Sequence, residues 1–227
     1  MPESTSQASI LAVGSGCNPG SSDPTNGGDK QMQHFVSVDK QNIFRLPVGW
    51  EYLVDTPGGP LNQANFKYYD NLVQSCIKLG VHCIIDIHNY ARWNGQIIGQ
   101  GGPTNADFAN TWSQLATAYK GDANVIMGIM NEPHEVEIGP WAETVQAAVT
   151  AIRNAGATTQ MILLPGNDWT SSGASVSDGS AAALLKVTNP SGDTKGLIYD
   201  FHNYFDSGSG TSTGCISNKI SDGFTPP

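Results

Sequence analysis

The chain has 227 residues, enough for one large domain with a sizeable hydrophobic core. Eleven lysines and arginines face twenty aspartates and glutamates, and the formal charge of -9 argues against nucleic acid or an anionic membrane surface as a partner. No apolar run approaches the length of a membrane span, and residues 1–16 lack the basic start and long apolar run of a secretory signal. The composition is that of a loop-rich globular protein.

Five apolar runs in the chain are predicted strands. They occupy residues 43–48, 83–87, 125–130, 161–164 and 197–201, at intervals of about 40 residues. Residues 10–13 could supply one further short strand, whereas residues 14–30 and 206–214 are rich in Gly and Ser and are predicted loops. Because the strands are apolar throughout, both of their faces are expected to be buried.

The segments between these strands carry helical patterns. Residues 64–79, 106–119 and 140–155 place apolar side chains on one face each, and a shorter helix is predicted at 179–187. Asn105 is the predicted N-cap of the second helix, and Gly80 and Gly156 follow the first and third as stop signals. Trp112 and Trp141 lie on the apolar helix faces and are predicted core residues.

Strand, helix and strand at this repeat length indicate parallel βα units, and hence an α/β fold. A closed (β/α)₈ TIM-type barrel needs eight such units and about 250 residues. This sequence supplies five units, or six if residues 10–13 count, so the prediction is a barrel of that type that is incomplete. An open doubly wound sheet is the alternative, and periodicity does not distinguish the two.

Polar and aromatic side chains follow each predicted strand. In parallel α/β folds the carboxyl ends of the strands form the ligand-binding edge. The residues expected there are Arg45, His88, Asn89, Asn131, Glu132, Trp169, His202 and Tyr204. Asp86 and Asp200 precede the strand ends and are expected to fix the backbone or Arg45. Trp50, Trp93 and Trp169 lie in or near loops, where an indole face can stack on a ligand.

Glu132 ends an apolar strand, which is unusual for a carboxylate. Pro133 disfavours a helical conformation at the preceding residue, so Glu132 is predicted to be extended. Burial at the strand end is expected to raise the pKa of its carboxyl group, as a general acid requires. The neighbouring Asn131 could donate a hydrogen bond to a ligand hydroxyl.

The chain has four cysteines. The spacing of Cys76 and Cys83 does not indicate a metal site, because His82 is the only further ligand type near them. Cys76 falls late in a predicted helix and Cys83 begins the next strand, so the two could form a disulfide across the intervening turn. Such a bond implies an oxidising compartment. The other two cysteines are Cys17 and Cys215.

Several of these motifs together resemble glycoside hydrolase family 5, and within it the fungal endo-β-1,4-glucanases. The resemblance covers residues 31–227 and is carried by "NIFRLPVGW", "DIHNYARWNG", "IIGQGGPTN", "GIMNEPH", "RNAGAT", "LPGNDW" and "DGSAAAL". It implies a (β/α)₈ barrel, retaining hydrolysis of cellulose, a secreted monomer, and no metal or organic cofactor. The expected partner is a β-1,4-glucan.

The resemblance also assigns roles to individual residues. Glu132 resembles the general acid/base, Asn131 the neighbour that binds the sugar 2-hydroxyl, and Arg45 the arginine that holds the nucleophile. His88, His202 and Tyr204 resemble the remaining polar residues of the active site, and Cys76 and Cys83 a family disulfide. Trp169 resembles a stacking platform, and Trp93 and Asn89 are expected to contact substrate with it.

The chain also departs from the family pattern. The family's first strand and last two strands are not matched, and the first of those last two carries the nucleophilic glutamate. No glutamate follows Glu143. Residues 1–30 are therefore predicted to be an irregular segment and residues 31–227 a partial catalytic barrel. The expected function is an endo-β-1,4-glucanase with little or no activity in this chain; the alternatives are a non-catalytic glucan-binding remnant and an incomplete piece of an enzyme.

Overall fold

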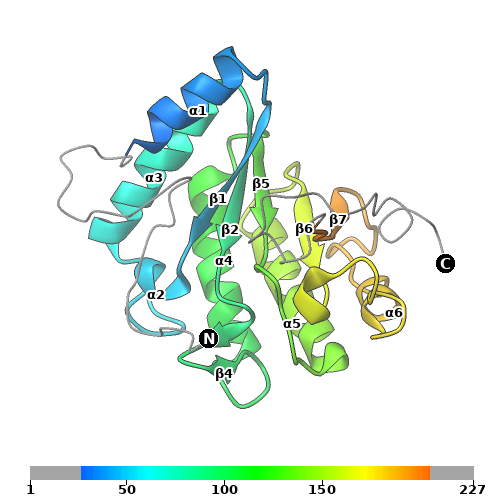
Figure 1. Ribbon diagram of the computed structural model, residues 1–227. Coiled ribbons are helices and arrows are strands. Elements are labelled where there is room, and N and C mark those ends of the chain that lie inside the picture. Colours follow the sequence, from blue (N-terminus) through cyan, green and yellow to red (C-terminus); the bar gives the residue numbers. More distant parts are fainter. Residues whose placement is uncertain (1–26, 205–227) are drawn as a thin grey trace.

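The computed structural model describes residues 27–204, and their centre is a five-stranded parallel sheet (Figure 1). Its strands are β1 (Ile43–Val48), β2 (His82–Ile87), β5 (Val125–Gly128), β6 (Ile162–Pro165) and β7 (Leu197–Asp200), and they lie in that order across the sheet. A doubly wound sheet reverses its strand order at a switch point, whereas a barrel wall follows the chain. The sheet is therefore one sector of a barrel-type α/β fold; the barrel prediction is confirmed and the doubly wound alternative is wrong.

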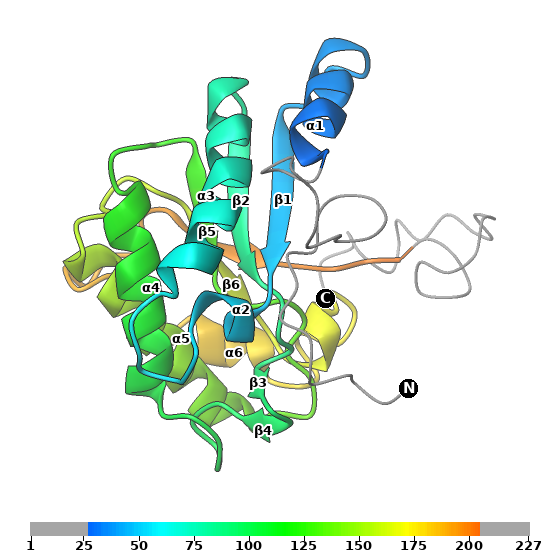
Figure 2. The same ribbon diagram turned by 90° about the vertical axis from the view of Figure 1, so that its left-hand side faces the viewer.

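The connecting helices cover the outside of this wall. They are α3 (Gln63–Lys78), α4 (Asn105–Tyr119), α5 (Ile138–Asn154) and α6 (Ser180–Leu184). Figure 2 shows α3, α4 and α5 on the same side of the sheet. Trp112 on α4 and Trp141 on α5 are fully buried, as predicted, and the Trp141 indole donates to the Pro165 carbonyl over 2.9 Å. Among residues 27–204, no helix has the length and apolar character needed to cross a membrane.

The two ends of the wall are β1 and β7, which do not pair with each other in the described part of the chain. Ile43 on β1 and Ile198 on β7 keep 43% and 40% of their surface exposed, and Tyr199 and Phe201 are exposed beside Ile198. The prediction that every strand is buried on both faces is therefore wrong for β7. Among residues 27–204, β7 has a neighbouring strand on one side only, and its apolar side chains are exposed on the other side.

Several short elements were not predicted. They are α1 (Gly28–Ser37), α2 (Trp50–Leu53), the two-stranded sheet of β3 (Arg92–Trp93) and β4 (Gln96–Ile97), and the 3₁₀ turn η1 (Asp168–Thr170). The loop predicted for residues 14–30 is wrong at its end, because α1 begins at Gly28. The predicted strand at 10–13 and loop at 206–214 lie outside the described residues.

The start of α4 differs from the prediction by one residue. Thr104, not Asn105, is the N-cap: its hydroxyl accepts the Asp107 N–H over 3.1 Å, and the Asp107 carboxylate accepts the Thr104 N–H over 2.8 Å. The Asn105 side chain instead accepts a hydrogen bond from Thr144 over 2.6 Å and so joins α4 to α5. A threonine three residues before an acidic residue is the stronger capping pattern, and it lies in the sequence.

Cys76 and Cys83 form a disulfide with an S–S distance of 2.10 Å, as predicted. It joins the end of α3 to the beginning of β2, and both residues are fully buried. Cys17 and Cys215 lie outside the described residues.

Candidate active site

Arg45 on β1 is the centre of a polar cluster at the carboxyl edge of the sheet. Its guanidinium contacts both carboxylate oxygens of Asp86, with Nε 3.0 Å from Oδ2 and Nη2 3.1 Å from Oδ1. Asp86 has no solvent exposure, and the His88 ring nitrogen Nδ1 lies 2.8 Å from its Oδ2. The Arg45 guanidinium thus balances one buried carboxylate, and the His88 ring contacts the same carboxylate. The prediction that Asp86 fixes Arg45 is confirmed.

Asn131 is oriented by the same guanidinium. Arg45 Nη2 donates to Asn131 Oδ1 over 3.0 Å, which fixes the amide oxygen toward β1. The amide nitrogen Nδ2 then lies on the other side, buried and without a hydrogen-bond partner among residues 27–204. A buried unsatisfied donor costs roughly 1–3 kcal/mol, so its presence at a strand end suggests a site for an acceptor.

Glu132 lies next along the chain, and its carboxylate is held by two side chains. His202 Nδ1 is 2.7 Å from Oε1, and the Tyr204 hydroxyl donates to the same oxygen over 3.2 Å. Glu132 is about 70 positions from His202 and Tyr204 in sequence, and the neighbouring β5, β6 and β7 strands bring the three together.

The backbone at Glu132 is not extended, so that prediction is wrong. Its φ is +42°, in the left-handed region that non-glycine residues rarely adopt. On one side the Asn131 N–H donates to the Ile87 carbonyl over 2.8 Å, and on the other the Pro133 carbonyl accepts from Trp169 N–H over 2.9 Å. The chain must turn sharply between these two anchors, and they outweigh the local preference imposed by Pro133.

The pKa of Glu132 also departs from the prediction. Burial alone would raise it, but the hydrogen bond and the charge of His202, with the hydrogen bond from Tyr204, outweigh burial and lower the pKa below its usual 4.5. The expected rise is therefore wrong for this chain. Glu132 is ionised at neutral pH and accepts hydrogen bonds.

His202 is the basic partner in this contact. Burial lowers its pKa, but the carboxylates of Asp200 and Glu132 outweigh both burial and the charge of Arg45 and raise the pKa from 6.5 to about 9. Arg45 Nη1 lies 2.8 Å from His202 Nε2, and Asp200 Oδ2 lies 3.6 Å from the same nitrogen. The carboxylates of Asp200 and Glu132 favour the charged ring, whereas the Arg45 N–H, which can only donate, favours a ring whose Nε2 accepts; the two influences on the pKa of His202 oppose each other. Asp200 was expected to fix the backbone or Arg45 and instead contacts His202.

Trp169 lies beside the cluster with 48% of its surface exposed, on the loop that follows β6. Its indole stacks on the His134 ring with 4.7 Å between centroids and 10° between planes. One face of the indole is thus covered and the other is open to a ligand. His134 and Tyr90, which lies edge-on to it, belong to the motifs that follow the predicted strands, but the sequence assigned neither of them a role.

Three other predicted ligand contacts lie farther toward the core. Trp50 is fully buried and donates from its indole to the Thr111 hydroxyl over 2.8 Å, so it is not a stacking platform. Trp93 is partly buried and packs edge-on against Trp50, with 4.9 Å between centroids. The Asn89 amide accepts from the Trp50 N–H and donates to Glu51, each over 2.6 Å. Both ends of the Asn89 side chain are thus used within the protein, and substrate contact by Trp93 and Asn89 stays a prediction.

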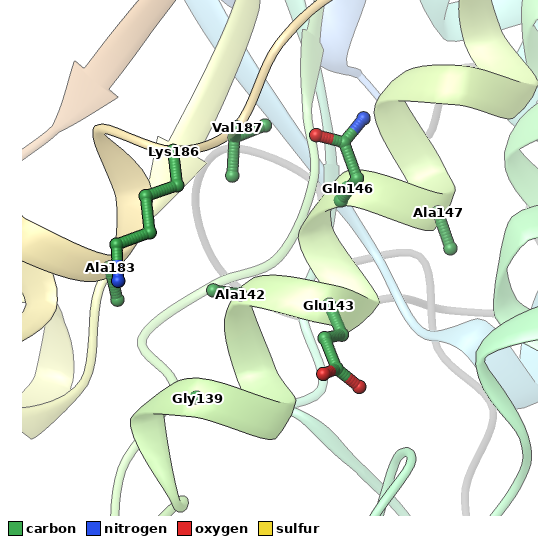
Figure 3. Close-up of a pocket in the computed structure, with 8 residues that line it drawn as sticks. All are labelled: Gly139, Ala142, Glu143, Gln146, Ala147, Ala183, Lys186 and Val187. Atoms are coloured by element: carbon green, nitrogen blue, oxygen red, sulfur yellow. The ribbon is translucent and has the colours of Figure 1, made fainter.

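A groove of about 520 Å³ lies between α5 and α6, on the outside of the wall (Figure 3). It is lined by residues of both helices and of the turn after α6: Gly139, Ala142, Glu143, Gln146, Ala147, Ala183, Lys186 and Val187. It shares no residue with the polar cluster. In the part of the chain that the structure describes, no three His, Cys, Asp or Glu side chains are arranged to hold a metal ion.

A strand-end acid and an open indole, side by side at the carboxyl edge of barrel-type strands, are features of enzymes that cleave sugar chains. The family model for cellulase (glycosyl hydrolase family 5) matches residues 12–225, and the chain belongs to this family.

Its relatives include fungal and bacterial endoglucanases. Endoglucanase EG-II of Hypocrea jecorina is 62% identical over 198 residues, which are 86% of this chain and 47% of the relative. Endoglucanase 1 of Saitozyma flava is 51% identical over 201 residues, which are 87% of this chain and 58% of the relative. The crystal structure of Cel5A (EG2) from Hypocrea jecorina superposes with a TM-score of 0.85 over 87% of this chain and 60% of that one, at 62% identity. The chain thus spans about half the length of the curated relatives it matches.

Proposed function

We propose that this chain is the part of an endo-β-1,4-glucanase that bears the general acid/base Glu132 and recognises the glucan chain. The observation that carries the proposal is the position of the Glu132 carboxylate directly after Asn131, whose buried amide nitrogen is unsatisfied among the described residues. The names of the relatives support it. Among them, Cel5A of Pseudomonas stutzeri, 28% identical and with a TM-score of 0.69 over 78% of this chain, was crystallised in complex with cellobiose.

Sugar recognition follows from the donors and ring faces of the cluster. Arg45 occupies the Asn131 amide oxygen, so the amide nitrogen is left for a sugar hydroxyl. The open face of Trp169 offers a flat apolar surface for the C–H face of a pyranose ring. A hydroxyl acceptor beside an apolar ring face is the chemistry of a β-1,4-linked glucose unit.

Hydrolysis with retention needs a second carboxyl group about 5 Å from the acid. Among the residues that the structure describes, Asp86 and Asp200 are the other carboxylates of the cluster, and each is engaged by a basic side chain: Asp86 by Arg45 and His88, and Asp200 by His202 at 3.6 Å. A protein of these 227 residues is therefore expected to bind glucan and to hydrolyse it at least about 10⁴-fold more slowly than a complete family member.

The charge of Glu132 supports the same expectation. In a retaining cycle Glu132 must first give a proton to the leaving glycosidic oxygen and then take one from the attacking water. The contact with His202 keeps the pKa of Glu132 low, so the proton is absent at neutral pH. A nucleophilic carboxylate nearby would raise that pKa by charge repulsion. This favours glucan binding without cleavage as the second candidate function of the chain.

The experiment combines binding and cleavage. Calorimetric titration with cellotetraose measures recognition, and reducing-sugar release from carboxymethyl-cellulose measures hydrolysis, with Glu132→Gln as the matched control. Binding without release supports the proposal for this chain. Release that disappears in Glu132→Gln would show that the chain is an active enzyme, and absence of binding would refute glucan recognition.

An extracellular location and a monomeric state belong to the same proposal. The location is supported by the Cys76–Cys83 disulfide, because such bonds persist mainly in oxidising compartments. Residues 31–227 are proposed as the catalytic-domain portion of the chain.

A further inference from the structure

Four aromatic rings form a continuous row along the carboxyl edge of the sheet. His88 and Tyr90 follow β2, His134 follows β5, and Trp169 follows β6. The centroid distances along the row are 5.5 Å from His88 to Tyr90, 6.0 Å from Tyr90 to His134 and 4.7 Å from His134 to Trp169. The first two contacts are edge-on, and only the last is stacked with nearly parallel planes.

The backbone of Trp169 is held by contacts that do not involve its side chain. Its φ is +56°, and Asp168 and Thr170 on either side also have positive φ. For a residue as bulky as tryptophan this conformation is strained, and the surrounding structure must hold it. The hydrogen bond from Trp169 N–H to the Pro133 carbonyl, 2.9 Å long, ties it to the residue that precedes His134. This hydrogen bond fixes the backbone position of Trp169 but not the orientation of the indole plane.

The plane of the indole is set by His134. The His134 side chain is only 11% exposed, and it fills the space between the edge-on Tyr90 ring and Trp169. Its Nδ1 lies 3.4 Å from the Glu135 carboxylate, which in turn lies 3.5 Å from Arg92 Nη2. The imidazole is thus held from three sides, and it covers one face of an indole that remains 48% exposed.

We propose that His134 is a positioning residue, whose imidazole plane holds the Trp169 indole so that the opposite indole face is presented to a sugar ring. The orientation of Trp169 by His134 stands on the geometry alone, and its effect on glucan binding rests on the proposed function. His134 itself does not touch substrate. A flat side chain at position 134 is required, whereas a hydrogen-bonding group there is not.

Removal of the ring therefore frees the indole to rotate. His134→Ala is expected to increase iodide quenching of Trp169 fluorescence, because the covered indole face becomes accessible. The same variant is expected to weaken cellotetraose binding about two- to tenfold, the range that an oriented aromatic pair contributes. His134→Phe keeps a flat ring in the same place and is expected to restore both values.

The fluorescence of Trp169 is separated from that of the other four tryptophans by subtracting the signal of the matching Trp169→Phe protein. Iodide quenching and near-UV circular dichroism are measured for the wild type, His134→Ala and His134→Phe, each with and without Trp169→Phe. His34→Ala is the matched control, because His34 also meets an aromatic ring edge-on but lies on α1, with 63% of its side chain exposed. The control is expected to match the wild type.

A change in the Trp169 signal in His134→Ala that His134→Phe reverses supports the proposal, whether or not the wild type binds cellotetraose. Failure of the wild type to bind cellotetraose refutes the proposed function instead. A Trp169 signal that is the same in His134→Ala and in the wild type overturns the positioning role. A change in the Trp169 signal in His134→Ala that His134→Phe fails to reverse overturns it as well.

Discussion

Raising the pH from 6.5 to 9.5 is expected to destabilise the folded chain through His202. Its pKa rises from 6.5 when unfolded to about 9 when folded, because Asp200 and Glu132 favour the charged ring. A raised folded-state pKa means that the stabilisation is complete below pH 6.5 and is lost as the pH rises through about 9. Glu132 has the opposite sign: its contribution is complete above pH 4.5 and is lost as the pH falls through its lowered pKa.

The size of the effect follows from the shift. Each pKa unit corresponds to about 1.4 kcal/mol, so His202 contributes at most about 3 kcal/mol to the free energy of unfolding at pH 6.5. The side chain is only 14% exposed, so solvent screening removes little of this. Urea unfolding at several pH values measures the free energy, and His202→Gln is the control that removes the titration of His202. Equal pH slopes in wild type and His202→Gln would refute the ionic contact between His202 and its two carboxylates.

Three further changes test the packing around the site. Arg45→Leu removes the main partner of the buried Asp86 and is expected to lower the free energy of unfolding by about 3 kcal/mol, measured as a lower thermal midpoint. The double variant with Asp86→Asn is expected to recover the midpoint. An unchanged midpoint in Arg45→Leu would contradict the pairing. Reduction of the Cys76–Cys83 disulfide, or replacement of both cysteines by serine, is expected to lower the free energy of unfolding by about 2.5 kcal/mol, because the bond closes only a short loop. Equal urea midpoints with and without reductant would contradict this. Gly128→Ala places a Cβ 2.8 Å from a carbonyl oxygen of β2 and is expected to cost roughly 1–3 kcal/mol in urea unfolding; a stable Gly128→Ala protein would show that the two strands can move apart.

The strands and main helices were predictable because burial on both sides leaves a mark in the sequence. The β1 strand was predicted with its observed bounds, and the other four lie within a few residues of their predicted ranges. The polar residues after these strands were predicted to meet because parallel strands end at one edge, and Arg45, Asn131 and Glu132 do meet there.

What could not be predicted depends on partners distant in the chain. The ionised state of Glu132 is set by His202 and Tyr204, and its left-handed backbone by hydrogen bonds to other loops. Local rules for the residue before proline and for a buried carboxyl group contain none of these partners. The stacking of His134 on Trp169 joins the loops after β5 and β6 in the same way. The exposure of β7 likewise depends on what lies beside it, which its own apolar sequence does not reveal.

The charge of Glu132 bears directly on the slow cleavage proposed for this chain. Carbon-13 NMR titration of its side-chain carboxyl, assigned by comparison with Glu132→Gln, measures that charge directly. We expect a titration midpoint below the 4.5 of an ordinary glutamate, and a rise of that midpoint in His202→Gln. A midpoint above pH 6 in the wild-type chain would show a protonated acid ready to donate, and would contradict the His202 contact as the group that sets its charge.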